Sequence, residues 1–366
     1  MPVLEKNDEE KRVAVYEFLK NSKFSNLHQS LEWANVKSDK WNQEIVYIEE
    51  NSKIKAAMVV LIRKIGAFSI MYAPRGPVCD ISDVNLVNEL VDNCNKIAKK
   101  YRAFVLKMDP AIEYNKQLEN KYKKKYKVKN KVNDILELMT PIKSMVLSLN
   151  GKNIVQIFDA FKPKTKYNIR LANKKGVIVR FSNREEDLKK FYNLMIITGK
   201  RDKIAIRSYQ YYKNIVDSFG INARIYLAEY NNEPLSAAIA ILYGKTVTYL
   251  YGASSNEKRN LMPNYLMQLN MIEWAINSGC LKYDFGGIFN TTMDNGLYRF
   301  KAGFCGEKGC ITYIGEIDKV YKRLYYLIYN KAFPIVEHII LKKIKKWNFL
   351  FLKIHFLMKE KKWVLK

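Results

Sequence analysis

The chain has 366 residues, of which 48% are hydrophobic and 27% are charged. That length and composition are typical of one large or two ordinary globular domains, so a fibre and a mostly disordered chain are excluded. The excess of 63 Lys and Arg over 36 Asp and Glu, a net charge of +27, predicts a polyanionic partner, although an AT-rich genome that favours Lys and Asn would also raise it.

Metal-binding and targeting signals are missing from the sequence. The five cysteines include no C-x-x-C pair and the chain has three histidines, so a zinc site of familiar spacing is not expected. The first residues, MPVLEKNDEEKRV, are acidic and polar, unlike a signal peptide. No run approaches the roughly 18 apolar residues of a membrane-spanning helix. We therefore expect a cytoplasmic protein with reduced thiols and no metal.

The first half of the chain predicts two strands, a helix and a third strand. Apolar runs at 56–61 and 68–72 are joined by a short turn and predict a hairpin. Residues 84–100 carry apolar side chains at helical spacing, and 103–109 predict the next strand.

The second half repeats this order. Runs at 237–242 and 247–251 predict another hairpin, 263–278 a helix, and 280–284 a strand that shares the motif Leu-Lys-x-Asp with the first copy. The repeat predicts a duplicated α/β domain. Its β-β-α-β order is that of the GNAT-type N-acetyltransferase fold, so we expect tandem GNAT-like N-acyltransferase domains at about 1–146 and 147–312.

Two segments depart from the simple repeat. Residues 113–133 are rich in Lys, Asn and Tyr and predict an exposed loop or a solvated helix. Residues 254–263 stand where coenzyme A-binding members of the fold have a glycine-rich turn that cradles the pyrophosphate. This stretch has no glycine and ends in Pro263, which lacks an N–H donor. The sequence therefore argues against coenzyme A as the acyl donor.

Seven motifs, taken together and in order, are similar to those of one family. They are QSLEWANVK at 29–37, YAPRGPV at 72–78, LKMDP at 106–110, KTKYNIRLA at 164–172, TGKRD at 198–202, RSYQYY at 207–212 and YRFKAGF at 298–304. From about 24 to 323, the chain resembles the Fem-type peptidoglycan aminoacyltransferases of low-GC Gram-positive bacteria.

The resemblance implies transfer of Gly, Ala or Ser from aminoacyl-tRNA to the stem-peptide amine of lipid II or UDP-MurNAc-pentapeptide, with no cofactor. It also implies that a C-terminal segment, about 313–338, returns to the first domain. Staphylococcal members carry a long helical arm, whereas here 212–220 leads directly into a strand at 223–228, which indicates an arm-less subtype. An acyl-CoA-dependent N-acyltransferase and a non-catalytic RNA- or membrane-surface-binding protein remain the alternatives.

The resemblance implies which residues bind the acceptor. Lys37 and Arg207 match positions that contact its diphosphate, and Tyr211 and Tyr251 match positions that line its groove. A guanidinium fork and an ammonium both suit phosphate oxygens. The alternative is that the bases are solvated and the tyrosines simply pack beside a sheet.

Two residues are candidates for the chemistry. Lys301 matches a lysine implicated in the transfer step, where an ammonium would stabilise the oxyanion or the departing ribose oxygen. Asp109 matches an acidic residue nominated as the base, which requires burial to raise its pKa. The alternative for Asp109 is a structural cap before Pro110.

The donor would need a cationic surface. Lys166, Arg170 and Lys174 fall at i, i+4 and i+8 of a predicted helix, so they share one face that would contact tRNA phosphates or, alternatively, only solvent. The tail at 339–366 places lysines around an aromatic run. This pattern predicts either a helix on the anionic inner leaflet of the cell membrane or a terminal helix packed on the first domain.

Overall fold

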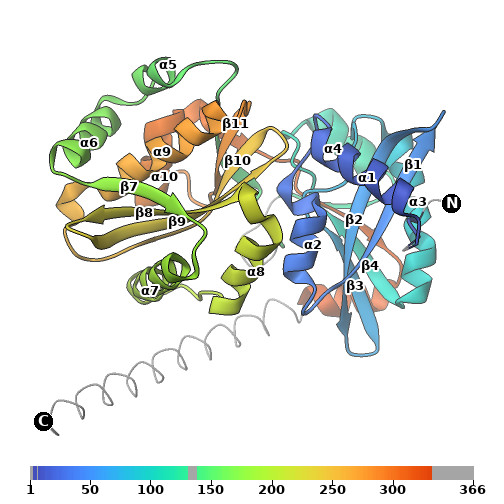
Figure 1. Ribbon diagram of the computed structural model, residues 1–366. Coiled ribbons are helices and arrows are strands. Elements are labelled where there is room, and N and C mark those ends of the chain that lie inside the picture. Colours follow the sequence, from blue (N-terminus) through green and yellow to red (C-terminus); the bar gives the residue numbers. More distant parts are fainter. Residues whose placement is uncertain (1–2, 6, 131–137, 332–366) are drawn as a thin grey trace, which may run out of the picture.

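The computed structural model describes residues 3–5, 7–130 and 138–331, and Figure 1 shows two α/β lobes side by side. The predicted tail at 339–366 lies outside the described residues. In the described ranges, no helix combines the length and apolar character needed to cross a bilayer.

The first lobe contains both strands and helices. They are α1 (Glu9–Asn21), α2 (Leu31–Lys37), β1 (Asn42–Glu50), β2 (Lys53–Ile65), β3 (Phe68–Ala73), α3 (Val84–Lys100), β4 (Ala103–Met108), α4 (Lys116–Lys123), β5 (Lys127–Lys129) and, much later in the chain, β13 (Glu316–Val320). The sheet order is β1-β2-β3-β4-β13-β5.

The second lobe is built on the same plan with more helices. Its elements are β6 (Lys143–Ser148), α5 (Ile154–Asp159), α6 (Pro163–Lys174), β7 (Ile178–Ser182), α7 (Glu185–Asp202), α8 (Tyr209–Phe219), β8 (Ala223–Tyr230), β9 (Glu233–Tyr243), β10 (Thr246–Ser254), α9 (Pro263–Asn277), β11 (Lys282–Gly287), α10 (Gly296–Cys305) and β12 (Cys310–Thr312). The sheet order is β12-β6-β11-β10-β9-β8-β7.

The predicted repeat is confirmed. The elements β2, β3, α3 and β4 correspond to β9, β10, α9 and β11, and in both copies the hairpin is antiparallel while the strand after the helix pairs in parallel with the hairpin's second strand. In the described part of the chain, α8 ends at Phe219 and β8 begins at Ala223, so no helical arm lies between these two elements. The arm-less subtype stays a prediction. The fold is the expected tandem GNAT-like α/β fold.

Local sequence explains the repeat helix of the first lobe. The carboxylate of Asp83 caps α3 by accepting hydrogen bonds from the N–H groups of Asn85 and Leu86. Leu90 and Cys94, one turn apart, are fully buried against the sheet. A polar cap and one apolar face therefore fix where this helix begins and which side it buries.

The expectation of an exposed loop or a solvated helix at 113–133 is wrong in part. Helix α4 buries Tyr122 completely, and the hydroxyl of Tyr122 donates to the carbonyl of Ile81. The short strand β5 pairs with β13 at the edge of the first sheet. Partners distant in the sequence thus hold a segment that looks solvated by composition.

The strand β13 carries the chain back into the first sheet, between β4 and β5. A buried ion cluster holds it there, since the Lys107 ammonium lies 2.6 Å from a Glu316 oxygen and 3.1 Å from an Asp318 oxygen. Strand β6, which contains the predicted boundary at 146, pairs only with β11 and β12 of the second sheet among the described strands. The domain limits inferred from the sequence stay a prediction.

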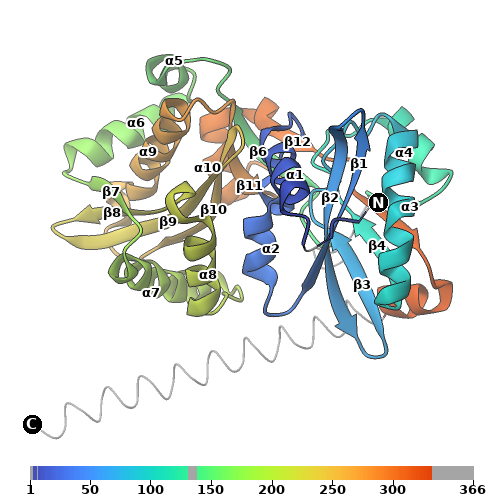
Figure 2. The ribbon, with the colours of Figure 1, turned by 45° about the vertical axis from the view of Figure 1, so that its right-hand side comes forward.

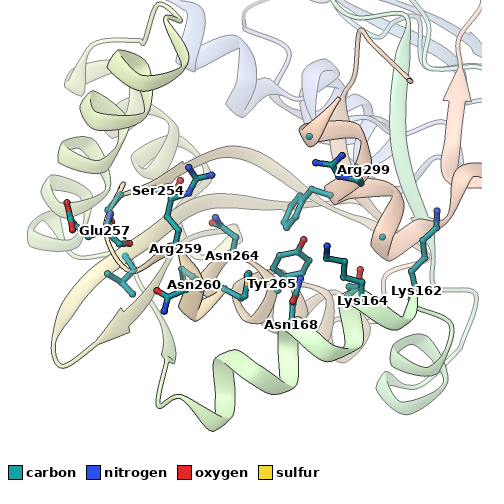
Figure 3. Close-up of a pocket in the computed structure, with 18 of the residues that line it drawn as sticks. Lys162, Lys164, Asn168, Ser254, Glu257, Arg259, Asn260, Asn264, Tyr265 and Arg299 are labelled. Atoms are coloured by element: carbon teal, nitrogen blue, oxygen red, sulfur yellow. Dashed lines mark hydrogen bonds between the residues drawn. The ribbon is translucent and has the colours of Figure 1, made fainter. Parts of the chain in front are cut away.

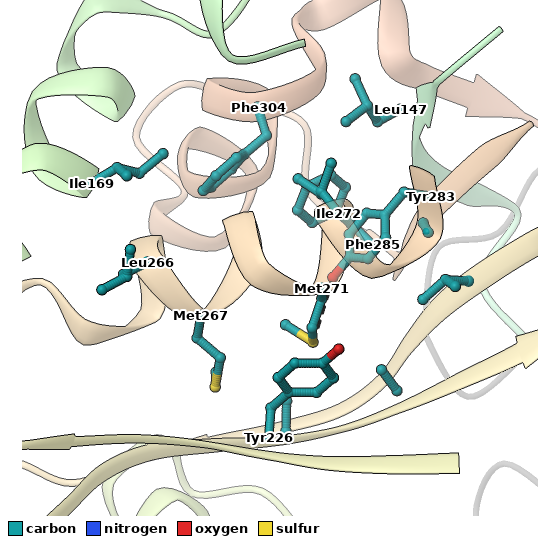
Figure 4. Packing of buried hydrophobic residues seen from close by; sticks show 14 of the residues in the cluster. Leu147, Ile169, Tyr226, Leu266, Met267, Met271, Ile272, Tyr283, Phe285 and Phe304 are labelled. Atoms are coloured by element: carbon teal, nitrogen blue, oxygen red, sulfur yellow. Dashed lines mark hydrogen bonds between the residues drawn. The ribbon is translucent and has the colours of Figure 1, made fainter. Parts of the chain in front are cut away.

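Apolar side chains pack against both faces of the second sheet. On one face, Met267, Met271 and Ile272 of α9 pack against Tyr226 and Phe285 from the sheet (Figure 4). On the other face, α7 and α8 pack together with α2 of the first lobe, which Figure 2 shows between the two sheets. Trp33 of α2 packs in this core of the second lobe, and Ala34 packs in the core of the first lobe. The last residue of α2, Lys37, therefore lies at the boundary between the lobes.

Candidate functional site

The four residues expected to bind the acceptor lie together at this boundary. The Lys37 ammonium, at the end of α2, donates a hydrogen bond of 2.7 Å to the Tyr211 hydroxyl of α8. The Tyr251 hydroxyl, on β10, is 3.5 Å from the same oxygen. The Arg207 guanidinium lies 5.5 Å from the Tyr211 ring centroid. Residues that are far apart in the sequence thus form one cationic, phenol-rich site.

The electrostatics of this site favour an anion. Burial, together with the smaller effect of the Arg207 charge, lowers the pKa of Lys37 to about 7. The ammonium is also held 4.5 Å from the Trp33 ring centroid and 4.8 Å from that of Tyr211. A negatively charged group placed between the two cations would relieve their repulsion and restore the charge on Lys37.

Lys301 is buried at a different place, on α10 beside the end of β11. Its ammonium donates hydrogen bonds to the carbonyls of Gly286, at 3.1 Å, and Gly287, at 2.9 Å. Burial lowers its pKa to about 8, although the nearby Asp284 charge opposes this effect. Two of its N–H groups are engaged, so the protonated form keeps a third for a substrate oxygen.

Asp109 is fully enclosed at the end of β4. One carboxylate oxygen accepts a 2.6 Å hydrogen bond from the Arg75 backbone N–H, and the other accepts from the hydroxyls of Tyr72, at 3.1 Å, and Thr140. The Arg75 guanidinium is 3.8 Å away. Burial raises the pKa of Asp109. These contacts tie the loop after β3 to β4, and none of them involves Lys301.

A cavity of about 680 Å³ opens at the start of α9 (Figure 3). The cations Lys164 from α6, Arg259 from the preceding loop and Arg299 from α10 point toward it. Tyr265 and Phe300 give it an aromatic wall, with their ring centroids 5.0 Å apart. Phosphates and a stacked base both suit such a lining.

The three cations expected to contact tRNA lie on another side of α6. The Lys166 ammonium donates to the Asp159 carbonyl, and the Arg170 guanidinium lies 5.3 Å from the Phe158 ring centroid, so both turn toward α5. Lys174 is exposed in the last turn. The cavity instead takes Lys164 and Asn168 from this helix. Their i, i+4 spacing is the signal that the sequence interpretation passed over.

The loop in front of α9 does not form a phosphate cradle of the coenzyme A type. Lys258 and Met262 have left-handed backbone conformations, with φ of 48° and 55°. Pro263 occupies the first turn of the helix, where it has no N–H to donate. Anion binding in this cavity therefore relies on side chains.

The fold is that of a tandem GNAT-like protein. A tandem GNAT protein of the clavulanic acid biosynthesis pathway shares the fold at a TM-score of 0.51 and 9% identity, over 87% of this chain and 97% of that one. The FemAB family model matches residues 11–234 and 229–333, so the chain belongs to the FemAB family.

Two relatives and one solved structure illustrate the match. A UDP-N-acetylmuramoylpentapeptide-lysine N(6)-alanyltransferase from Weissella viridescens is 33% identical over 328 residues, covering 87% of this chain and 96% of the relative. A lipid II:glycine glycyltransferase from Staphylococcus haemolyticus is 28% identical, covering 87% and 93%. The crystal structure of FemX superposes with a TM-score of 0.79 at 25% identity, covering 90% and 100%.

Proposed function

We propose that the protein transfers an amino acid from aminoacyl-tRNA to the stem-peptide amine of a peptidoglycan precursor and so builds the interpeptide bridge. FemAB membership and the alanyl- and glycyltransferase relatives support an aminoacyltransferase that acts on such a precursor. The observation that carries the proposal is the assembly of Lys37, Arg207, Tyr211 and Tyr251 between the lobes, where a diphosphate would be held.

The chemistry is aminolysis of an ester. The acceptor amine attacks the ester carbonyl and forms a C–N bond, and the intermediate carries an oxyanion until the bond to the ribose oxygen breaks. The attacking nitrogen loses one proton and the ribose oxygen gains one, so the products are an amide and a free hydroxyl. The third N–H of protonated Lys301 would stabilise that oxyanion or protonate the ribose oxygen. An aminoacyl ester is already activated, so orientation of the two substrates supplies much of the remaining rate.

The basic, aromatic cavity at α9 supports aminoacyl-tRNA as the donor. Its cations suit the phosphates at the acceptor end of the tRNA, and Tyr265 and Phe300 suit a terminal base. Lys166, Arg170 and Lys174 would extend the cationic surface along α6. A cytoplasmic location and contact with the inner face of the membrane stay proposals, and the basic, aromatic tail supports the membrane contact.

A transfer assay read by mass spectrometry tests this function. The protein is mixed with a pool of charged tRNA and with lipid II or UDP-MurNAc-pentapeptide, and the expected product is heavier than one precursor by one amino-acid residue. Consumption of acetyl-CoA in a parallel tube, without that product, would replace the tRNA donor by coenzyme A. If the protein is inactive in both tubes while a known glycyltransferase is active in the same mixture, the result would favour a non-catalytic binding protein.

The acceptor site predicts a pH dependence of binding. Lys37 has a pKa of about 7 in the free protein, and a bound diphosphate favours its charged form. Affinity for UDP-MurNAc-pentapeptide is therefore expected to be full below pH 7 and to fall, by up to about tenfold per pH unit, as pH rises above it. Titration calorimetry from pH 6 to 9 measures this loss. Lys37→Arg keeps its charge throughout, so the same pH dependence in both proteins would contradict this role.

Substitutions in the cavity at α9 are expected to weaken tRNA binding without weakening binding of the acceptor. Arg259→Ala with Arg299→Ala is expected to weaken tRNA binding and to lower the slope of log K against log salt by about 2, because two phosphate contacts are lost. Affinity for UDP-MurNAc-pentapeptide should not change. Lys308→Ala, which removes an exposed cation outside the cavity, is the matched control. An unchanged salt slope in the double variant would place the tRNA elsewhere.

A further inference from the structure

A helix over 323–331 follows directly after β13. An amphipathic helix normally buries its aliphatic side and exposes its polar side, and this helix does the opposite. Its inner side is aromatic and polar, since the hydroxyl of buried Tyr326 donates to Asp318 at 2.8 Å and the Tyr329 ring lies 5.3 Å from that of Phe104. Its outer side is aliphatic. Leu324 is 66% exposed, Leu327 48% and Ile328 54%. Their i, i+3 and i+4 spacing places them on one outward stripe.

The tip of the β2–β3 hairpin extends this stripe. The Phe68 ring, at the start of β3, lies 3.9 Å from the Tyr325 ring, and Figures 1 and 2 both show the helix beside the hairpin at the foot of the first lobe. Two cations lie over the Phe68 ring, the Arg102 guanidinium at 5.2 Å and the Lys322 ammonium at 5.5 Å from its centroid. Ile65, paired with Phe68 in the hairpin, is 37% exposed.

These residues form one surface that is apolar in the middle and cationic at the side. We call it the foot surface, and its members are Ile65, Arg102, Lys322, Leu324, Leu327 and Ile328. We propose that the foot surface docks the protein onto an anionic lipid bilayer. Aliphatic side chains on an exposed helix enter the boundary between headgroups and acyl chains, while the adjacent cations bind anionic headgroups.

Charge decides between this partner and the other possible occupants. The chain after residue 331 contains nine lysines and only Glu337 and Glu360 as acids, so it would be repelled by the cations of the foot surface. A second copy of the protein would bring the same cations. RNA would be attracted by them, but it would gain nothing from three exposed aliphatic side chains. An anionic bilayer offers acyl chains to the aliphatic side chains and anionic headgroups to the cations. The lysines after residue 331 would be attracted to the same headgroups.

Sedimentation with vesicles tests the proposal in the absence of tRNA and precursor, so the result does not depend on the transfer reaction. The full-length protein is expected to bind vesicles of phosphatidylglycerol and phosphatidylcholine, and to bind pure phosphatidylcholine at least tenfold more weakly. The variant Leu324→Ser/Leu327→Ser/Ile328→Ser should lose tenfold or more in affinity for the anionic vesicles. Val155→Ser with Ile221→Ser, which removes exposed aliphatic side chains from the second lobe, is the matched control and should bind as the wild type does.

A second measurement shows what covers the helix in solution. An environment-sensitive dye attached to Leu324→Cys should report a water-exposed position alone, and a blue shift should appear only when anionic vesicles are added. A blue shift without vesicles would mean that the chain itself or a second copy occupies the foot surface, which overturns the proposal. Equal vesicle binding by the triple-serine variant and the wild type would overturn it as well. So would tRNA binding that needs Arg102 and Lys322 while vesicle binding is absent.

Discussion

Replacing Lys301 by alanine is expected to lower kcat for amino-acid transfer by about 10² to 10³, the usual effect of removing one donor to an oxyanion. The buried ammonium is already held by the carbonyls of Gly286 and Gly287, so it costs no reorganisation when charge develops on the substrate. Binding of the acceptor and of tRNA should change little, because Lys301 lines neither the cavity at α9 nor the acceptor site around Lys37 and Tyr211. Single-turnover kinetics with preformed complexes measures the chemical step alone.

Two controls separate chemistry from folding. Lys301→Met keeps the length and apolar stem of the side chain in its buried position, and it should lose as much activity as the alanine variant while melting close to the wild type. Lys308→Ala removes an exposed cation near the same helix and should leave kcat unchanged. If Lys301→Met kept more than a tenth of the wild-type kcat, Lys301 would not be the group that stabilises the oxyanion.

The pH profile identifies which form of Lys301 acts. With a pKa of about 8, the side chain is mostly an ammonium at pH 7 and mostly a neutral amine at pH 9. If the ammonium is required, the ratio of wild-type kcat to that of Lys301→Arg should fall as pH rises through 8, since arginine stays charged. Taking the ratio removes the titration of the acceptor amine, which affects both proteins equally. A ratio that rises through pH 8 would instead assign Lys301 as a base.

The repeated fold could be predicted because its signals are local. Two apolar runs, an amphipathic helix and a closing strand recur in the same order, and each is visible within about 20 residues of sequence. Strand β5 could not be predicted in this way. It has three residues, Lys127–Lys129, two of them charged, and it exists because β13 returns to pair with it. A strand whose stability comes from a distant partner leaves no local pattern.

The residues of the candidate site also fall into those that a sequence pattern could indicate and those that depend on packing between distant elements. Motifs implied Lys37, Arg207, Tyr211 and Tyr251, and the structure brings these side chains together across the lobes. Helical spacing alone indicated that Lys166 and Arg170 share a face, but not that this face turns toward α5. Which side of a helix meets a cavity depends on how the helix is rotated against its neighbours, so the cavity at α9 appeared only in three dimensions.

Replacing Asp109 by alanine is expected to lower the free energy of unfolding by about 3–5 kcal/mol, because several buried donors lose their acceptor at once. These are the Arg75 N–H and the hydroxyls of Tyr72 and Thr140. Urea denaturation measures the loss. Asp92→Ala, which removes a half-exposed carboxylate paired with Lys125, should change stability by less than about 1 kcal/mol.

The same experiment decides between the two roles considered for Asp109. A carboxylate whose oxygens both accept hydrogen bonds, from Arg75, Tyr72 and Thr140, is better suited to hold the loop around Arg75 than to take a proton from a substrate. In that case, the fraction of Asp109→Ala that stays folded should keep a kcat within about tenfold of the wild type, well above the Lys301 variants. A stable Asp109→Ala protein with kcat reduced more than 10²-fold would reverse this assignment and make Asp109 the general base.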